Sequence, residues 1–426
     1  MNFATFGRYA VSICAAGALL AGCAGSHATA LTPSLDRSFG LGAGPSSGGE
    51  TVLYGFTGGN DGGNAATGLI VDGRGNLYGT TVVGGTYACG TVFKLAPQAG
   101  PPWPETVLYN FGCFADGKNP HGGVSFDRGG NLVGTTVAGG SGGYCTGDGC
   151  GIVFQLRSQV EKVLYDFTGG SDGFGPGTSV VFDPAGHAYS TAPDGGTYSQ
   201  GVVYELSQRG GKWRQDVIHA FTGGKDGGVG SLGALLLDPS GSLFGVTEIG
   251  GAHGAGTVFK LSPQSPQRWK MTTLYAFKGA PDAASPYGGL VADASGNLYG
   301  TTYYGGANGL GSIFELVANA KGKYRERVLY SFAGGTDGSS TTSTLAFGTS
   351  GDLYGTTSAG GGSCDCGTIF KVNPKSGKET VLHRFGARGD GAYPYYGLTA
   401  DAAGHFYGTT VAGGPFNQGT VFEFTP

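Results

Sequence analysis

The chain has 426 residues, of which 89 are glycine and 19 are proline, and its formal net charge is −4. Hydrophobic residues make up 39% and aromatic residues 12%, which supplies enough apolar surface for a core and argues against disorder. Charged residues are sparse at 13% and no long basic run occurs, so we do not expect a nucleic-acid partner.

The first 23 residues have the features of a bacterial export signal. Arg8 precedes an apolar segment, Tyr9 to Leu20, that is too short to span a bilayer as a helix. The following Leu20-Ala21-Gly22-Cys23 resembles the bacterial lipobox, which implies lipid attachment at Cys23. Ordinary cleavage after Ala30 is the alternative.

Either route predicts a protein outside the cytoplasm. Because Ala24 is not aspartate, a lipidated protein would resemble those sorted to the outer membrane; the alternative is a secreted protein. Residues 24–49 are rich in Gly, Ser, Ala and Pro and predict a flexible tether to a folded domain over 50–426. We expect a monomer that meets the membrane only through its lipid.

Residues 51–426 contain seven copies of one unit of about 55 residues. In chain order, the first copy predicts short strands over 51–56 (TVLYGF), 68–72 (GLIVD), 76–81 (NLYGTT) and 90–95 (GTVFKL), with no helical periodicity between them. The first run of each copy ends at a phenylalanine: Phe56, Phe111, Phe167, Phe221, Phe277, Phe332 and Phe385.

A tight turn is predicted between the second and third strands of each unit. DPAG at Asp183, DPSG at Asp238 and DASG at Asp293 are typical of a type I turn that closes on a left-handed glycine. These aspartates therefore have a structural explanation.

Seven four-stranded antiparallel units predict an all-β fold, a seven-bladed β-propeller. An open solenoid is the alternative, but it would leave both terminal strands unpaired. The repeats begin with a lone first run, 51–56, and stop after a lone fourth run, GTVFEF at 419–424. We therefore predict that Val52 to Phe56 pairs with Thr420 to Phe424 and closes the ring.

The repeat resembles the Gloeo–Verruco (GloVer) tandem-repeat family of exported bacterial proteins. The motifs that carry this resemblance are GNLYGTT at Gly75 and Gly296, GTVFKL at Gly90 and Gly256, and VLYxF throughout. The GLxxDxxGNLY portion is also similar to NHL-type propeller repeats. The resemblance implies export and a propeller fold, and it implies no activity.

Six cysteines follow the export signal. Cys89 precedes the fourth run of one unit and Cys113 follows the strand that should pair with it, so topology predicts a disulfide between them. Cys145 and Cys150 flank a short turn and should also pair. The pairing of Cys364 with Cys366, across Asp365 alone, is the third expectation.

Tyrosines gather in the loops of units five to seven, which topology assigns to one face, termed the top face. Aromatic rings with a polar tip suit stacking on sugars or contact with a protein, and packing between blades is the alternative. The candidate ligand-binding residues are Tyr287, Tyr303, Tyr304, Tyr393, Tyr395 and Tyr396.

Two carboxylates depart from the repeat in units three and four. Asp194 and Glu248 replace apolar residues in neighbouring top loops, with His253 nearby, and they are candidates for acid–base catalysis on a glycan. The alternative is that they are solvated loop charges.

No metal-binding pattern occurs and no cofactor is expected. The aspartates of the longer top loops (Asp61 and its equivalents) could form a cation-binding ring, but aspartate before glycine more often stabilises its own turn. The prediction is a non-catalytic surface module that binds a glycan or a protein. A glycan-active hydrolase or lyase and a purely structural protein are the alternatives.

Overall fold

The computed structural model describes residues 49–426 except 66, 146, 231–232, 266–267, 320 and 388. The predicted signal and Cys23 lie outside the described residues. Residues 46–426 form one compact unit. Within the described range, no helix has the length and apolarity needed to cross a membrane.

The first three blades each consist of four antiparallel strands in chain order. Their strands are β2 (Ile70–Val71), β3 (Leu77–Thr81), β4 (Thr91–Leu95) and β5 (Glu105–Asn110); β6 (Val124–Phe126), β7 (Leu132–Thr136), β8 (Ile152–Arg157) and β9 (Val160–Asp166); and β10 (Val181–Phe182), β11 (Ala188–Ala192), β12 (Val202–Arg209) and β13 (Lys212–Ala220). The innermost strands have only two or three residues, shorter than their apolar runs suggested.

Blades four to six follow the same plan, with an additional short strand in two of them. Their strands are β14 (Gly228–Gly230), β15 (Leu236–Leu237), β16 (Leu243–Ile249), β17 (Thr257–Ser265) and β18 (Arg268–Ala276); β19 (Ala283–Pro286), β20 (Val291–Ala292), β21 (Leu298–Gly305), β22 (Ser312–Ala318) and β23 (Tyr324–Ser331); and β24 (Ala346–Phe347), β25 (Leu353–Thr357), β26 (Thr368–Val372) and β27 (Glu379–Arg384).

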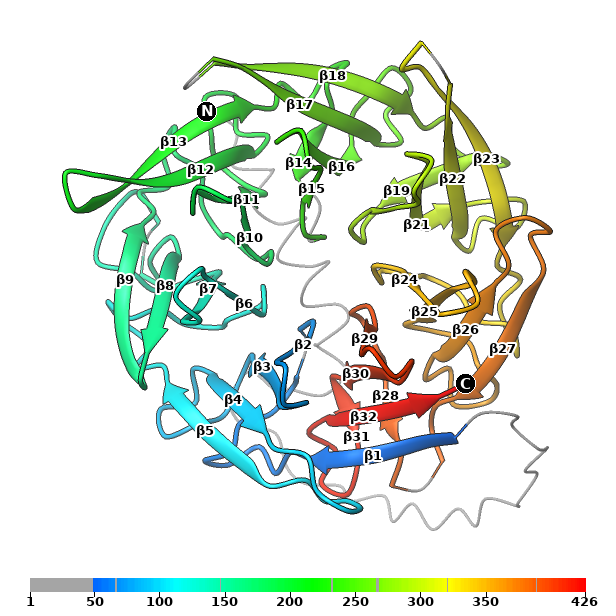
Figure 1. Ribbon diagram of the computed structural model, residues 1–426, viewed down its shortest axis with the longest axis horizontal. Helices are drawn as coiled ribbons and strands as arrows, with labels where there is room; N and C mark the ends of the chain where they lie inside the picture. The colour runs from blue at the N-terminus through cyan, green and yellow to red at the C-terminus, as the bar shows by residue number, and fades with distance from the viewer. Residues whose placement is uncertain are drawn as a thin grey trace, which may run out of the picture. The chain divides into compact units, whose positions relative to one another are not determined.

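The seventh blade combines both ends of the repeat region. It consists of β29 (Thr399–Ala400), β30 (Phe406–Thr410), β32 (Thr420–Thr425) and β1 (Gly49–Gly55), and β28 (Gly391–Ala392) pairs with β31 (Ala412–Gly413) beside it. Gly49 lies opposite Thr425 and Gly55 opposite Thr420. The predicted closure is confirmed, and Figure 1 shows β1 alongside β32 at the perimeter of the ring.

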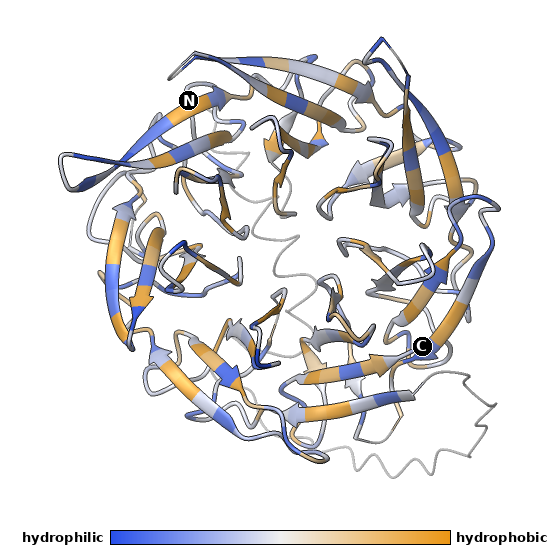
Figure 2. Ribbon diagram, viewed as in Figure 1, coloured by the Kyte–Doolittle hydropathy of each residue, from blue (hydrophilic) through white to orange (hydrophobic). Residues whose placement is uncertain are grey.

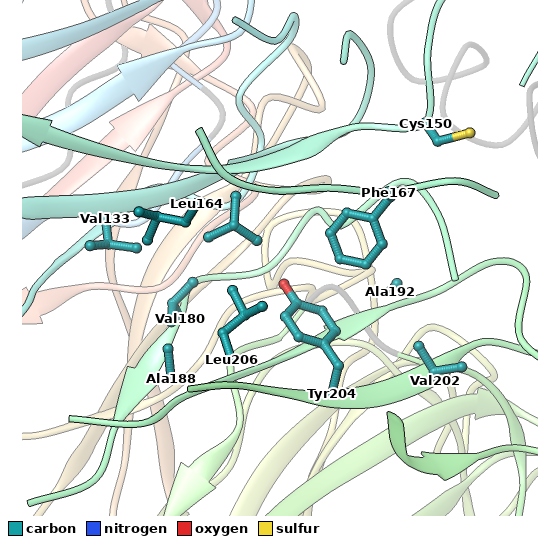
Figure 3. Close-up of a cluster of buried hydrophobic side chains, with 11 residues drawn as sticks. Val133, Cys150, Leu164, Phe167, Val180, Ala188, Ala192, Val202, Tyr204 and Leu206 are labelled. Carbon is teal, nitrogen blue, oxygen red and sulfur yellow. The ribbon is translucent and has the colours of Figure 1, made fainter. Parts of the chain in front are cut away.

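Aromatic pairs join each blade to the next. The phenylalanine that ends each outer strand is buried against an aromatic ring of the third strand in the next blade, with centroids about 5 Å apart. These pairs are Phe56–Phe93, Phe111–Phe154, Phe167–Tyr204, Phe221–Phe259, Phe277–Phe314, Phe332–Phe370 and Phe385–Phe422. Figure 3 shows Phe167 facing Tyr204 within the core between blades two and three. Along the outer strands, hydrophobic and hydrophilic residues alternate (Figure 2).

The glycine of the GTT motif is required by this packing. A Cβ at Gly408 would lie 2.4 Å from Cζ of Phe422, and one at Gly300 would lie 2.5 Å from Cζ of Phe314. Only a residue without a side chain fits beneath such a ring. Blade three departs from this rule, because Ser190 lies opposite Tyr204 there.

The first threonine of the GTT motif links neighbouring blades. Its hydroxyl donates to a carbonyl of the loop entering the next blade, as from Thr80 to Pro120 (3.0 Å) and from Thr301 to Ser343 (2.7 Å). The bond from Thr409 to Thr67 (2.8 Å) links the seventh blade to the first. Blade four has Val246 at this position and lacks the hydroxyl.

Each top loop carries an aspartate shortly after the end of the preceding outer strand. The aspartate of each top loop accepts a hydrogen bond from the tyrosine or histidine near the end of the preceding outer strand, as Asp61 does from Tyr54 (3.1 Å). It also accepts from a backbone N–H four residues earlier, that of Thr57 in this copy (2.8 Å). The aspartates therefore stabilise their turns.

A glutamate at the start of the next outer strand faces this aspartate in five blades. Burial first, and the neighbouring aspartate second, raise the pKa of each glutamate to about 7 or about 8, and Oε1 of each is buried without a hydrogen-bond partner in the described part of the chain. The pairs are Glu50–Asp390, Glu105–Asp61, Glu161–Asp116, Glu326–Asp282 and Glu379–Asp337. In blade three the equivalent residue is neutral Gln215, which donates to the carbonyl of Asp172 (3.0 Å).

Candidate functional site

The top face is formed by two kinds of loop: those that enter each innermost strand and those that join the second strand to the third. The two kinds meet in every blade, through β14 with β16, β19 with β21, β28 with β31, and through bridges such as Gly63 with Val83. The predicted grouping of these loops on one face is therefore confirmed.

A repeated backbone conformation occurs in the loop that enters each innermost strand. One residue of this loop has a positive φ in all seven copies: Asn64, Asn119, Gly175, Val229, Ser285, Ser340 and Tyr393. Two positions further on, blades two, five and seven carry the large polar residues His121, Tyr287 and Tyr395. Because the copies share this geometry, these three side chains occupy equivalent positions around the ring.

Three tyrosines of blade five form a cluster. The ring of Tyr303 lies 4.7 Å from that of Tyr304 and 6.4 Å from that of Tyr287, centroid to centroid. Tyr304 is 55% exposed, whereas Tyr287 and Tyr303 are half-buried. The cluster therefore offers one accessible ring, that of Tyr304, which contacts Tyr303, and Tyr303 in turn contacts Tyr287.

The loop that carries the tyrosines of blade seven lies near this cluster. A Cβ on Gly288 would lie 3.0 Å from the carbonyl oxygen of Thr342, and the hydroxyl of Thr342 donates a hydrogen bond to the carbonyl of Tyr395. Burial raises the pKa of Tyr287, and Glu248, Tyr396, Tyr303 and Tyr395 raise it further. Burial and then Tyr303 raise the pKa of Tyr395 to about 12.

Backbone contacts hold the tyrosines of blade seven in place. The carbonyl of Tyr395 accepts a hydrogen bond from the hydroxyl of Thr342, and that of Tyr396 accepts one from Thr356 (3.1 Å). Tyr393, with a φ of 60°, packs against the core of its own blade. It therefore differs from the other five candidate tyrosines, which lie at the cluster.

Glu248 is the carboxylate next to this cluster. It lies near the end of β16 and is half-buried. Burial first, and the Glu248 charge in addition, raise the pKa of Tyr287, while burial, Tyr303 and then Glu248 raise the pKa of Tyr304. Burial raises the pKa of Glu248 itself. Within the described part of the chain, it makes no salt bridge and no side-chain hydrogen bond.

The other two catalytic candidates lie in different surroundings. Asp194 is half-buried, and burial raises its pKa; its carbonyl accepts a hydrogen bond from the N–H of Phe174 (3.0 Å). His253 is exposed in the loop after β16.

His121 is a top-face residue that the sequence reading missed. It occupies the position of Tyr287 and Tyr395 in blade two, and burial lowers its pKa to about 4. Aligning Asn119-Pro120-His121 with Ser285-Pro286-Tyr287 would have identified it.

One group of three described residues could hold a metal ion, namely Glu50, His383 and Asp390, whose ligand atoms lie within 4.8 Å of one another. The same carboxyl pair recurs at four other junctions with tyrosine in place of histidine. Burial and then the charge of Asp390 raise the pKa of Glu50 to about 8, so a proton held by Glu50 accounts for the group without a metal.

Two surface depressions, of about 390 and 550 Å³, are lined by turns of the opposite face and by residues of the adjoining strands. The first contains Lys371 and Lys378 and the second Lys94 and Arg157. Neither is lined by a candidate site residue.

Three disulfides join the predicted cysteines: Cys89 with Cys113, Cys145 with Cys150, and Cys364 with Cys366. All lie in the loops of the top face. They are compatible with a location outside the cytoplasm.

The fold and loops define a closed seven-bladed β-propeller. Sequence matches to the Gloeobacter/Verrucomicrobia repeat cover residues 42–181, 146–325 and 231–426, so the chain belongs to this repeat family and the resemblance is confirmed. No curated protein matches the chain significantly.

Several solved structures of low sequence identity are similar to this chain. A fungal alcohol oxidase of the AA5 family, in complex with copper, aligns with a TM-score of 0.52 at 14% identity, over 89% of this chain and 76% of its own. A putative 6-phosphogluconolactonase from Bacteroides uniformis has a TM-score of 0.49 at 15% identity (75% and 84% covered). A periplasmic gluconolactonase from Pseudomonas aeruginosa has a TM-score of 0.48 at 16% identity (80% and 94% covered). The likeness to the alcohol oxidase supports the fold alone.

Proposed function

We propose that this propeller is a non-catalytic binding module that takes a glycan on its top face, at the tyrosines of blades five and seven. The observation that carries the proposal is the cluster of Tyr303, Tyr304 and Tyr287, in which the exposed ring of Tyr304 contacts Tyr303 and Tyr303 contacts Tyr287. An aromatic ring fixed in this way offers its apolar face to a sugar while its hydroxyl remains available for hydrogen bonding.

Binding accounts for the site better than catalysis does. A glycosidase places two carboxyl groups on either side of one bond. Glu248 interacts electrostatically with Tyr287. Burial alone accounts for the raised pKa of Glu248 and for that of Asp194. A purely structural role would leave the exposed ring of Tyr304 without a use.

A glycan array probed with the purified protein would identify the ligand, and substitution would locate its site. Tyr304→Ala together with Tyr396→Ala should weaken binding about tenfold or more, because each stacked ring contributes roughly 0.5–1.5 kcal/mol and 1.4 kcal/mol is a factor of ten. Tyr198→Ala is the matched control, since Tyr198 is 57% exposed on a top loop of blade three. Equal loss in both variants, or no binding to any glycan, would refute the proposal.

We further propose that lipid on Cys23 holds the module at the outer membrane. The basis is the sequence Leu20-Ala21-Gly22-Cys23. Cys23→Ser should move the protein from the membrane fraction to the soluble fraction, and unchanged retention would refute lipid anchoring.

A further inference from the structure

Glu248 has no structural task in its blade. The equivalent residues of the other blades are Val82, Val137, Pro193, Tyr303, Ser358 and Val411. None is charged, and the same strand pairing forms beside each of them. In blade four, the neighbouring Thr247 still hydrogen-bonds with Thr257 (2.9 Å), as its counterparts Thr302 and Ser312 do in blade five. The scaffold therefore does not need a carboxylate at this position.

The surroundings of Glu248 suit a cation. A half-buried carboxylate without a basic partner carries a desolvation cost that a bound positive group would offset. Glu248 lies beside the blade-five loop that carries Tyr287, because a Cβ on Gly256 would lie 2.8 Å from the carbonyl oxygen of Glu248 and 2.7 Å from Cδ of Pro286. Aromatic rings such as those of the tyrosine cluster also attract cations. No described Lys, Arg or His forms a salt bridge with Glu248, so the complementary charge is left to a ligand.

We propose that the tyrosine cluster and Glu248 select an amine-bearing glycan, in which the protonated amine of a hexosamine contacts the Glu248 carboxylate while the sugar ring stacks on Tyr304. This inference rests on the proposed glycan-binding function and specifies its ligand. A neutral or N-acetylated sugar can use the ring of Tyr304 but offers no charge to Glu248.

The test compares three β-1,4-linked tetrasaccharides that differ only at carbon 2: those of glucosamine, N-acetylglucosamine and glucose. Calorimetric titration of the purified protein, at a pH where the free amine is protonated, should give at least tenfold tighter binding of the glucosamine tetramer. Glu248→Gln should abolish this preference while the affinity for the glucose tetramer stays unchanged, and an unaltered melting temperature verifies its fold.

The control for non-specific attraction is Asp148→Asn, which removes another top-face carboxylate, one paired with Lys118 (2.7 Å). It should leave the preference intact. Equal affinity for all three tetramers, or an equal effect of Asp148→Asn and Glu248→Gln, overturns the amine selectivity and leaves glycan binding standing. Failure of the glucosamine tetramer to bind also overturns it, whichever glycans bind on the array. Loss of all glycan binding overturns the proposed function itself.

Discussion

The hydroxyl of Thr409 donates a hydrogen bond of 2.8 Å to the carbonyl of Thr67, across 342 residues of sequence. Equivalent bonds join consecutive blades elsewhere in the ring, for example from Thr135 to Thr178 (3.0 Å). The junction between the two ends of the repeat region is therefore built like any other. The completed ring leaves no blade without an outer strand, which removes the exposed edge that an open array would have.

Removal of the closing strand should destabilise the whole propeller. A chain that begins at Thr57 lacks β1 and the buried side chains of Leu53 and Phe56, each of which contributes about 1.5–3 kcal/mol on burial. It also exposes the edge of β32. We expect a lower melting temperature and self-association in light scattering.

A chain that begins at Ser46 keeps β1 and is the control, which should remain monomeric. A monomeric Thr57 chain that melts with the control would contradict closure.

Loss of the Thr409 hydroxyl should cost about 1 kcal/mol, the usual contribution of one hydrogen bond. Thr409→Val is expected to fold, because blade four carries Val246 at the same position. Thr80→Val, at an ordinary junction, should cost the same. Chemical denaturation would measure both free energies of unfolding, and a markedly smaller cost at Thr409 would show that the end junction is weaker than the others.

Addition of one methyl group at Gly408 should be harmful. Its Cβ would lie 2.4 Å from Cζ of Phe422, so Gly408→Ala overpacks the core and should cost about 1–3 kcal/mol. Gly73→Ala is the control, because a Cβ there meets no atom within 4 Å. Denaturant midpoints would compare the two, and equal midpoints would contradict this explanation of the GTT motif.

The fold could be predicted because each blade repeats its turn residues, its aromatic residues and its strand pattern. Ring closure could be predicted because the repeats begin with a lone first strand and end with a lone fourth strand, so each end supplies the strand that the other lacks. The aspartates could be assigned to turns, since Asp before Gly has that use in any loop.

The candidate site could be predicted only in part. Tyr287, Tyr303 and Tyr304 were recognisable as departures from the repeat, but their approach to Glu248 depends on how two blades are placed in space. His121 was hidden because its position is defined by a backbone conformation. The carboxyl pairs were hidden because their members lie more than 40 residues apart in sequence, as Asp61 and Glu105 do.

The carboxyl pairs predict that stability falls as the pH rises through neutrality. Burial and a facing aspartate raise the pKa of Glu105, Glu161 and Glu326 to about 7 in the folded state, well above that of an exposed glutamate. From about pH 4.5 to 7, the folded chain therefore holds protons that the unfolded chain has released. Their stabilising effect is complete below this range and is lost as the glutamates ionise.

Below this range, a second group of carboxyls acts in the opposite direction. Hydrogen bonds within the tight turns lower the pKa of Asp72, Asp127, Asp293 and Asp401, so their stabilising effect is lost in acid. The two trends together place maximal stability at mildly acidic pH.

Melting temperatures measured between pH 5 and 9 should accordingly decrease by roughly 5 °C or more, after allowance for the partial exposure of the glutamates. A variant with Glu105→Gln, Glu161→Gln and Glu326→Gln should lose most of this slope, because an amide can donate a hydrogen bond as the protonated acid does. Gln215 already occupies the equivalent position in blade three, so the variant is expected to fold.

Changing Asp148 to Asn instead should leave the slope as it is, since that carboxylate is exposed and paired with Lys118. A melting temperature that rises from pH 5 to 8, or a slope that survives the triple substitution, would show that the glutamates are ionised in the folded protein.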